Sequence, residues 1–189
     1  MKNVYCRELS VDFTFDRTAL DKIIASYDKP NERWTTRIPL EELDPQVDAF
    51  LKPMGLMIVR AEVFYVPANQ ESPHPHIDSS KFSNRAKINW VYGAPNSTMK
   101  WWEPYDVEAP AKVMTTRTGS LYGVYDGPMY LAHEEKIGLP SLVNSGHLHS
   151  ITNPDPTGRW CVSCSVGDEP GHQIEWDQAH PLLEPFFKR

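Results

Sequence analysis

The apolar positions in the first 55 residues follow the period of a helix. Asp16 can cap a first helix that ends before Pro30, with apolar residues at i, i+3, i+4 and i+7: Leu20, Ile23, Ile24 and Tyr27. Asp44 followed by Pro45 predicts the start of a second helix, and Pro53 predicts its end. We therefore expect two helices before residue 56.

From residue 56 the pattern becomes that of strands. The run at 56–66 reads LMIVRAEVFYV and is rich in β-branched and aromatic residues. Similar runs follow at 87–92, 113–116, 120–125, 142–143 and 160–166. Turn signals such as GAPNS and NPDPTG separate them. Short strands at this spacing predict a sandwich, barrel or jelly roll.

The proline content supports a chain of short strands and many turns. There are 17 prolines in 189 residues, nearly twice the usual share of about 5%. No internal repeat, low-complexity tract or linker marks a second domain. We expect a single domain over 1–189, with 1–55 as helical support, 56–166 as the β core and 167–189 as an irregular or briefly helical tail.

Charge and cysteine content narrow the class of protein. The net charge of −6, without a basic cluster, argues against nucleic-acid binding. Three cysteines do not make a disulfide framework and suit a reducing compartment. The N-terminal residues lack the apolar core of a signal peptide, and the longest apolar run, 55–59, is too short to cross a membrane. We expect a soluble, cytoplasmic protein.

One group of residues has the chemistry of a metal site. His76 and Asp78 are two apart, so on a strand their side chains point to the same face. One more imidazole from a neighbouring strand would complete two nitrogens and one oxygen on one face of a metal ion, as in non-haem Fe(II) oxygenases. His149 is the preferred third residue. Its rival is His147, which lies on the same strand face but close to the turn signal NSG.

The turn signal NPDPTG predicts a hairpin between residues 148–153 and 159–166. In that hairpin Asn153 opposes Arg159, and His149 opposes Ser163. Arg159 then lies about 13 Å along the sheet from His149. A dicarboxylic ligand that chelates the metal at one end, with a two-pronged guanidinium contact at the other, spans about that gap.

In order and context, these residues resemble the motifs of the Fe(II)/2-oxoglutarate-dependent oxygenases. Members of that family show His-x-Asp, then a distal His followed by x-(Val/Ile)-x-Asn, and an Arg about ten residues further on. This chain has His76 and Asp78 in HID, His149 at the start of HSITN, and then Arg159. The earlier YVPA, beginning at Tyr65, is similar to the Tyr-x-Pro-Gly of the prolyl-hydroxylase-like branch.

The resemblance covers roughly residues 56–166 and implies a mainly β fold, a double-stranded β-helix (jelly roll). It implies that His76, Asp78 and His149 bind Fe(II), and that Arg159, helped by Tyr65, holds the distal carboxylate of the co-substrate 2-oxoglutarate. The implied reaction uses O2 to hydroxylate a peptide or protein side chain or a small molecule, and it releases succinate and CO2. Cys161 stands where the family often has a Ser or Thr beside the arginine.

Plainer interpretations of the same residues stay open. His76 and Asp78 can be a surface pair in a proline-rich loop, and Arg159 a strand-end charge. The protein could then be a non-catalytic jelly-roll ligand-binding module, or a cupin-like metalloprotein without a co-substrate. The aromatic residues around 90–102 are equally compatible with a core and with a substrate entrance. The remaining histidines, His74, His133, His172 and His180, are expected in loops or at the surface.

Overall fold

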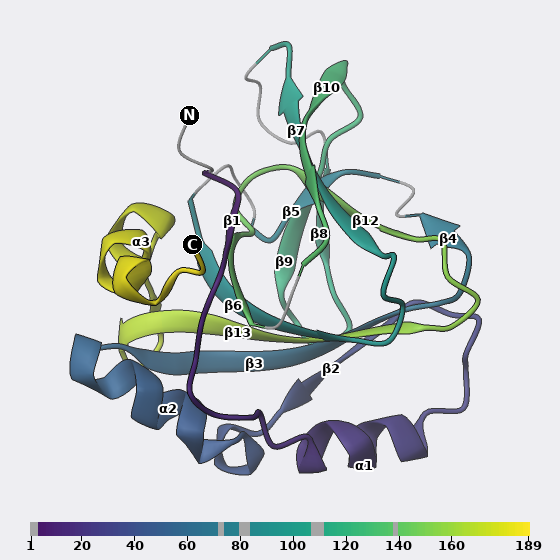
Figure 1. Ribbon diagram of the computed structural model, residues 1–189. Coiled ribbons are helices and arrows are strands. Elements are labelled where there is room, and N and C mark those ends of the chain that lie inside the picture. Colours follow the sequence, from purple (N-terminus) through teal and green to yellow (C-terminus); the bar gives the residue numbers. More distant parts are fainter. Residues whose placement is uncertain (1–3, 72–73, 80–83, 107–111, 138–139) are drawn as a thin grey trace.

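The computed structural model describes residues 4–71, 74–79, 84–106, 112–137 and 140–189. Strands dominate, and they form two antiparallel sheets that face each other (Figure 1). Sheet I has the order β1-β11-β6-β13-β3-β2, with β14 paired to β13. Its strands are β1 (Cys6–Glu8), β2 (Trp34–Ile38), β3 (Met57–Val66), β6 (Ala86–Tyr92), β11 (Ser141–Asn144), β13 (Arg159–Glu169) and β14 (His172–Gln173).

Sheet II has the order β10-β7-β12-β5-β9-β8, with β4 paired to β12. Its strands are β4 (Gln70–Glu71), β5 (His76–Ile77), β7 (Thr98–Pro104), β8 (Lys112–Thr115), β9 (Leu121–Val124), β10 (Met129–Glu135) and β12 (His149–Asn153). Two antiparallel sheets with this mixing of early and late strands confirm the mainly β, jelly-roll class.

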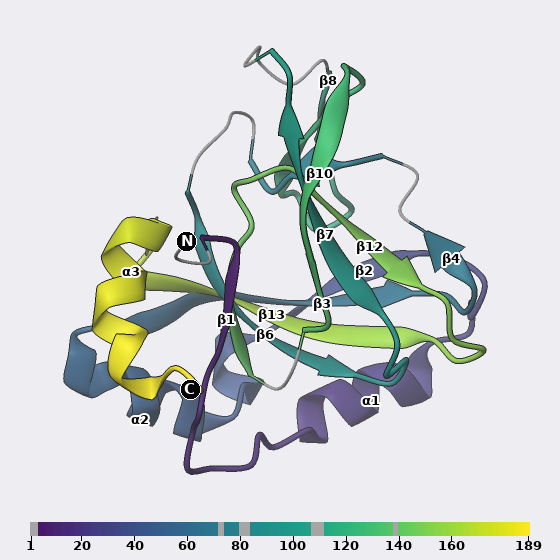
Figure 2. The same ribbon diagram turned by 45° about the horizontal axis from the view of Figure 1, so that its top comes forward.

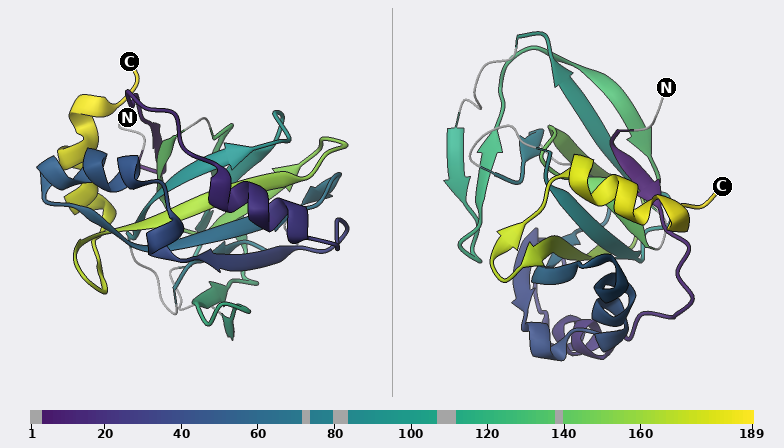
Figure 3. Two further views of the ribbon diagram at one scale, coloured as in Figure 1. Left: turned by 90° about the horizontal axis from the view of Figure 1, so that it is seen from below. Right: turned by 90° about the vertical axis from the view of Figure 1, so that its left-hand side faces the viewer.

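The two expected N-terminal helices form, and they cover the face of sheet I that points away from sheet II (Figure 1; Figure 3, left). Helix α2 (Pro45–Leu51) begins as predicted, since the Asp44 carboxylate accepts a hydrogen bond from the Gln46 amide at 2.9 Å. Helix α1 (Thr18–Ser26) begins slightly later than predicted. Its N-cap is Arg17, although Asp16 still accepts from the Thr18 amide at 2.9 Å.

The C-terminal segment closes one end of sheet I. Helix α3 (Trp176–Leu183) follows β14 and lies beside β1 (Figure 2). The chain then pairs with the start of the protein through a bridge between Leu9 and Phe187, and the Lys188 amide donates to the Glu8 carbonyl at 2.9 Å. Short 3-10 turns complete the structure at Leu40–Glu42, Lys52–Met54 and Glu184–Phe186. None of the helices in the described part of the chain is long and apolar enough to cross a membrane.

The main apolar core lies between sheet I and the helices. It includes fully buried residues from each helix and from the central strands, for example Leu20, Val47, Val63, Val162 and Leu183. Two smaller clusters lie elsewhere, one around Trp101 and one around Ile77. Because the helices cover the outer face of sheet I, the inner face of that sheet is left to line the space between the sheets.

The predicted hairpin between 148–153 and 159–166 is wrong. Strand β12 pairs with β7, β5 and β4 in sheet II, whereas β13 pairs with β3 and β6 in sheet I. Asn153 therefore does not oppose Arg159, which instead pairs with Val66, and Ser163 pairs with Asn89 and Glu62 rather than with His149. The turn signal does end one strand and start another, but the chain crosses there from one sheet to the other.

The segment that follows GAPNS is a strand rather than a loop. It forms β7, which pairs with β12 on one side and β10 on the other. Trp101 is completely buried, and its indole nitrogen donates to the Asn144 carbonyl at 3.1 Å. Trp90 is also buried in the main core. Trp90 and Trp101 are therefore core residues and do not form a substrate entrance.

Candidate metal centre

Three of the residues singled out from the sequence come together between the sheets. The Nε2 atoms of His76 and His149 each lie 3.8 Å from Oδ1 of Asp78, and the imidazole centroids are 4.5 Å apart. The ligand atoms of all three lie within 4.8 Å of one another. Cis ligands of an octahedral ion with bonds of about 2.1 Å are about 3 Å apart. Small side-chain rotations therefore suffice for this group to hold a metal ion.

The strand pairing explains why these residues meet. His76 and His149 are directly opposite each other on β5 and β12, and laterally paired residues share one face of a sheet. Asp78 follows two residues after His76, so it returns to the same face. His147 is not part of this group. Its Nε2 lies 3.1 Å from the Asn84 side-chain oxygen, and its Nδ1 lies 3.5 Å from Glu103.

Backbone carbonyls orient both imidazoles. Nδ1 of His149 lies 2.9 Å from the His147 carbonyl, and Nδ1 of His76 lies 3.4 Å from the His74 carbonyl. A carbonyl oxygen only accepts, so in both rings the proton belongs on Nδ1. The lone pair of each Nε2 then faces Asp78. Carbonyl partners of this kind are common behind metal-binding histidines.

Burial keeps the two imidazoles neutral. It lowers the pKa of His76 to about 4, with a contribution from the neighbouring His149, and it also lowers the pKa of His149. Neutral imidazole is the form that binds metal ions.

Asp78 is held in the ionised form. Burial alone would raise the pKa of its carboxyl, but the charge of the Lys87 ammonium and its hydrogen bond outweigh this effect and hold that pKa well below its usual range. Lys87 Nζ donates to Oδ2 of Asp78 at 2.7 Å. This contact leaves Oδ1 facing the histidines.

A cavity of about 520 Å³ opens from the three residues and runs between the two sheets. Sheet I contributes the alternate residues Arg159, Cys161 and Ser163 on β13, and Lys87 and Asn89 on β6. The other lining residues include Trp34 on β2, Arg117, and three residues of sheet II: Met99, Tyr122 and Ile151. The volume is within the range of small-molecule sites, about 300 to 1,000 Å³.

Arg159 is part of this cavity and is only 3% exposed. No carboxylate among the described residues lies within ion-pair distance of its guanidinium. Burial lowers the pKa of the Arg159 side chain, and a hydrogen bond with Cys161 partly offsets that effect. Transferring a guanidinium from water without a counter-charge is unfavourable. The surroundings of Arg159 therefore suit an anionic ligand.

Tyr65 also lines the cavity, on the strand next to Arg159. Its hydroxyl donates to the Pro30 carbonyl at 2.9 Å, and its ring packs on Trp160 with a centroid distance of 4.4 Å. The hydroxyl keeps a lone pair that can accept a hydrogen bond, but its proton is used by Pro30.

Two cavity residues, Lys87 and Arg33, are not marked by the sequence motifs. Lys87 is 6% exposed, and a lysine inside the strand run AKINWVY is a signal that could have been noticed. Arg33 lines the cavity, and desolvation together with the charge of Arg159 lowers the pKa of its guanidinium. It precedes β2, so no strand or motif pattern marks it.

The other histidines and cysteines are not part of this group. Among them, Cys161 lines the same cavity. His74 is an exposed bend residue 3.7 Å from Asp126, and His172 contacts Asp168 at 2.5 Å at the surface. Cys161 and Cys164 are free and buried; because they are three apart on one strand, their side chains point to opposite faces of the sheet. His133 differs from the expectation of an isolated surface residue, because it contacts Glu135 at 2.8 Å.

No family model and no curated protein matches the chain. Among solved structures, it resembles the cysteine peptidase Peruvianin-I from Thevetia peruviana latex at 9% identity, over 80% of this chain and 71% of that one, with a TM-score of 0.37. An oxalate oxidase matches at 13% identity and a TM-score of 0.37, and a recombinant oxalate oxidase in complex with glycolate at 12% and 0.34. Both matches cover 96% of this chain and 94% of the other.

Proposed function

We propose that this protein is an Fe(II)- and 2-oxoglutarate-dependent oxygenase that hydroxylates a peptide or protein side chain or a small molecule. The observation that carries the proposal is the position of Arg159. This buried guanidinium has no acidic partner among the described residues, and it lines the same cavity as His76, Asp78 and His149. A chelating dicarboxylate needs a metal ion at one end and a cation at the other, and the His76 group and Arg159 can provide these two contacts.

The donor set suits iron. Two neutral imidazoles and one carboxylate from one side leave three octahedral positions for a bidentate co-substrate and O2. In our proposal the Nε2 atoms of His76 and His149 and Oδ1 of Asp78 are the ligands. Lys87 keeps the carboxylate turned towards the histidines through its contact with Oδ2.

The charge of the cavity suits a dianion. Its lining contains the cationic residues Arg33, Lys87, Arg117 and Arg159, whereas its acidic residues are Asp78 and Glu32. Glu32 is exposed, and its carboxylate lies 3.3 Å from the ammonium of Lys29, a residue that does not line the cavity. The excess of positive charge favours a ligand with two carboxylates, such as 2-oxoglutarate.

When bound, Fe(II), 2-oxoglutarate and O2 together supply the oxidant for a C–H bond, with succinate and CO2 as products. The chain's own part is to hold three ligand atoms on one side, to orient the dicarboxylate through Arg159 and to limit water between the sheets. Trp34 and Tyr122 in the cavity lining offer apolar contact to a substrate. We also propose a cytoplasmic location, which the three free cysteines support.

Succinate release from 2-oxoglutarate, with Fe(II) and ascorbate, tests the proposal. We expect turnover in the wild type, its loss in His76→Ala and Arg159→Ala, and weakened 2-oxoglutarate binding in Arg159→Lys, because lysine cannot make the two-pronged contact. Arg37→Ala is the matched control, since Arg37 is exposed and donates to the Thr118 carbonyl, outside the cavity. Binding is measured alongside turnover by calorimetry.

The alternatives give different results in the same experiment. A cupin-like metalloprotein would bind metal through His76 but would not bind 2-oxoglutarate. A non-catalytic ligand-binding module would show no His76-dependent metal binding. Either result, or normal binding in both His76→Ala and Arg159→Ala, would overturn the oxygenase proposal.

A further inference from the structure

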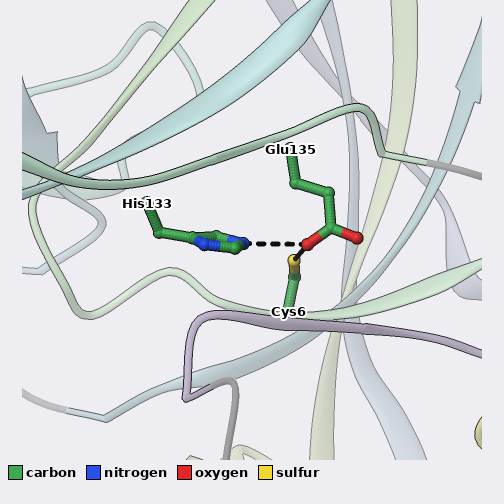
Figure 4. A group of neighbouring side chains, drawn as sticks. All are labelled: Cys6, His133 and Glu135. Atoms are coloured by element: carbon green, nitrogen blue, oxygen red, sulfur yellow. Dashed lines mark hydrogen bonds and ion pairs between the residues drawn. The ribbon is translucent and has the colours of Figure 1, made fainter. Parts of the chain in front are cut away.

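A second group of metal-binding side chains joins the two sheets at one edge. It consists of Cys6 on β1, and His133 and Glu135 on β10 (Figure 4). Strand β1 is the last strand of sheet I on its side, and β10 is the last strand of sheet II. Figure 3, right, shows these two edge strands side by side. The group therefore connects two parts of the fold that no backbone pairing connects at this edge in the described structure.

The three side chains converge on one oxygen. Oε2 of Glu135 lies 2.9 Å from the Cys6 sulfur and 2.8 Å from Nε2 of His133. The three ligand atoms lie within 4.8 Å of one another. In a tetrahedral zinc site, with Zn–S near 2.3 Å and Zn–N and Zn–O near 2.0 to 2.1 Å, ligand atoms are about 3.3 to 3.8 Å apart. A shift of less than about 1 Å per side chain would open room for the ion.

The surroundings limit how the imidazole can move. The Tyr5 ring stacks on His133 with a centroid distance of 5.4 Å and an interplanar angle of 13°, and Trp101 lies 5.7 Å away. Cys6 is buried, whereas the side chains of His133 and Glu135 are 30% and 45% exposed. An ion can thus reach the group from solvent, and its imidazole is already oriented.

This group is separate from the candidate iron site. Trp101 pairs with His149 on one side and with His133 on the other, so the three residues form one row on the inner face of sheet II. Two strand spacings, about 10 Å, separate the backbones of the two histidines. Trp101 is fully buried between them.

The arrangement does not fit a cysteine nucleophile. In a nucleophilic triad the imidazole lies between the thiol and the acid, so that it can take the thiol proton. Here the Glu135 oxygen contacts both the Cys6 sulfur and the His133 nitrogen (Figure 4). In addition, Cys6 is only 3% exposed, which hinders attack on a substrate.

We propose that Cys6, His133 and Glu135 form a zinc site that joins the edges of the two sheets. A thiolate, an imidazole and a carboxylate are a donor set that Zn²⁺ takes in proteins, with water as the fourth ligand. Binding releases the thiol proton to solvent, and the ion replaces the hydrogen bonds that Glu135 now accepts. The ion would tie the edge strands β1 and β10 together, and this does not depend on the proposed oxygenase activity.

Titration of the tag-free protein with Co²⁺ tests this site, because cobalt bound to a thiolate absorbs in the near ultraviolet. The titration uses a His76→Ala/Asp78→Ala background, which removes the other metal group. We expect one Co²⁺ per chain with a thiolate band, displaced by Zn²⁺. Cys6→Ser should abolish the band, and His133→Ala should weaken binding at least tenfold. Cys161→Ser is the control, since Cys161 lies in the cavity and should leave the band unchanged.

A stability measurement guards against variants that fold poorly. Zn²⁺ should raise the Tm of the background protein, and it should not raise the Tm of Glu135→Gln, whose changed residue is partly exposed at an edge strand. Circular dichroism establishes that each variant is folded. The absence of a thiolate band in folded background protein overturns the proposal, as does a band that survives in Cys6→Ser. Equal Co²⁺ affinity in His133→Ala and its parent also overturns it.

Discussion

Lys87 donates to Oδ2 of Asp78 at 2.7 Å, while the other oxygen of that carboxylate, Oδ1, lies 3.8 Å from Nε2 of both His76 and His149. The two oxygens of Asp78 thus have different partners. Lys87 belongs to sheet I and the histidines to sheet II, so the carboxylate is oriented from the opposite sheet. The relative position of the two sheets therefore decides whether the three ligand atoms meet.

We predict that Lys87→Met weakens metal binding at the His76 group about tenfold. Two effects oppose each other. Removal of a nearby cation favours a metal ion, but the Asp78 carboxylate loses the contact that orients it, and loss of such supporting contacts typically reduces metal affinity about 10- to 100-fold. We expect the second effect to dominate. Mn²⁺ affinity, measured by electron paramagnetic resonance, checks this.

Lys100→Met is the matched control for Lys87→Met. Lys100 Nζ lies 2.8 Å from the Glu71 carboxylate, in an ion pair outside the cavity lining. The Lys100→Met variant should bind Mn²⁺ with the same affinity as the wild type. Equal affinities in the two lysine variants would show that Lys87 does not orient the carboxylate.

We predict that Asn153→Ala destabilises the protein by about 2 to 3 kcal/mol. The Asn153 side chain is completely buried, and it donates to the carbonyls of Pro67 and Thr157 at 2.8 and 2.9 Å. Its oxygen accepts from the Asp155 amide at 3.1 Å. Alanine leaves these buried groups without partners, which costs about 1 to 3 kcal/mol for a buried group. Urea unfolding measures the change.

Pro154→Ala is the comparison for Asn153→Ala, because both residues lie in the same crossover. Proline contributes mainly by restricting the unfolded chain, so its replacement should cost less than about 1 kcal/mol. If Pro154→Ala costs as much as Asn153→Ala, the prolines rather than the Asn153 hydrogen bonds maintain this crossover.

Much of the fold could be predicted from local patterns. The β-branched runs at 56–66 and 160–166 coincide with β3 and part of β13, because such residues pack well on pleated surfaces. The pair Asp44 and Pro45 gives the start of α2, because a cap depends on a few neighbouring residues. Two-residue spacing brought His76 and Asp78 to one face for the same local reason.

The parts that could not be predicted depend on distant partners. NPDPTG shows that the chain turns, but not whether the next strand joins the same sheet or the opposite one. Lys87 was missed because its role depends on Asp78 across the cavity. The group of Cys6, His133 and Glu135 was missed because it joins edge strands more than 120 residues apart in sequence.

Glu62 makes stability depend on pH in the acid range. Burial alone would raise the pKa of this carboxyl, but a hydrogen bond from Thr118, the charge of Lys87 and the ion pair with Arg60 outweigh it, so the pKa is lowered. Because the folded pKa lies below the unfolded one, Glu62 contributes stability above the unfolded pKa, which is about 4.3 for Glu. This contribution is lost as the pH falls through the folded pKa.

We therefore predict that Glu62→Gln unfolds more easily than the wild type near pH 6, and that the difference shrinks as the pH falls below about 4. The free energy of unfolding in urea, measured across this range, checks the prediction. The exposed Glu41→Gln serves as control and should show no such trend. A difference between Glu62→Gln and wild type that stays constant with pH would contradict the linkage.

Gly158, which directly precedes Arg159 in the chain, provides the space for the Tyr65 ring. A Cβ at Gly158 would lie 2.2 Å from Cε2 of Tyr65 and 2.4 Å from its hydroxyl oxygen. The ring has little room to retreat, since it packs on Trp160 and its hydroxyl donates to the Pro30 carbonyl at 2.9 Å. Added volume in a packed site typically costs about 1 to 3 kcal/mol.

We predict that Gly158→Ala costs about 1 to 3 kcal/mol of stability and weakens 2-oxoglutarate binding severalfold, because the clash with the Tyr65 ring shifts the backbone that leads into Arg159. A double-mutant cycle separates this clash from other effects of the alanine. In a Tyr65→Ala background the new methyl group meets open space, so Gly158→Ala should then cost little, and the two changes should be clearly non-additive. Urea unfolding and calorimetric titration with 2-oxoglutarate measure both quantities. Additive effects on stability would show that the Tyr65 ring does not limit the residue at position 158.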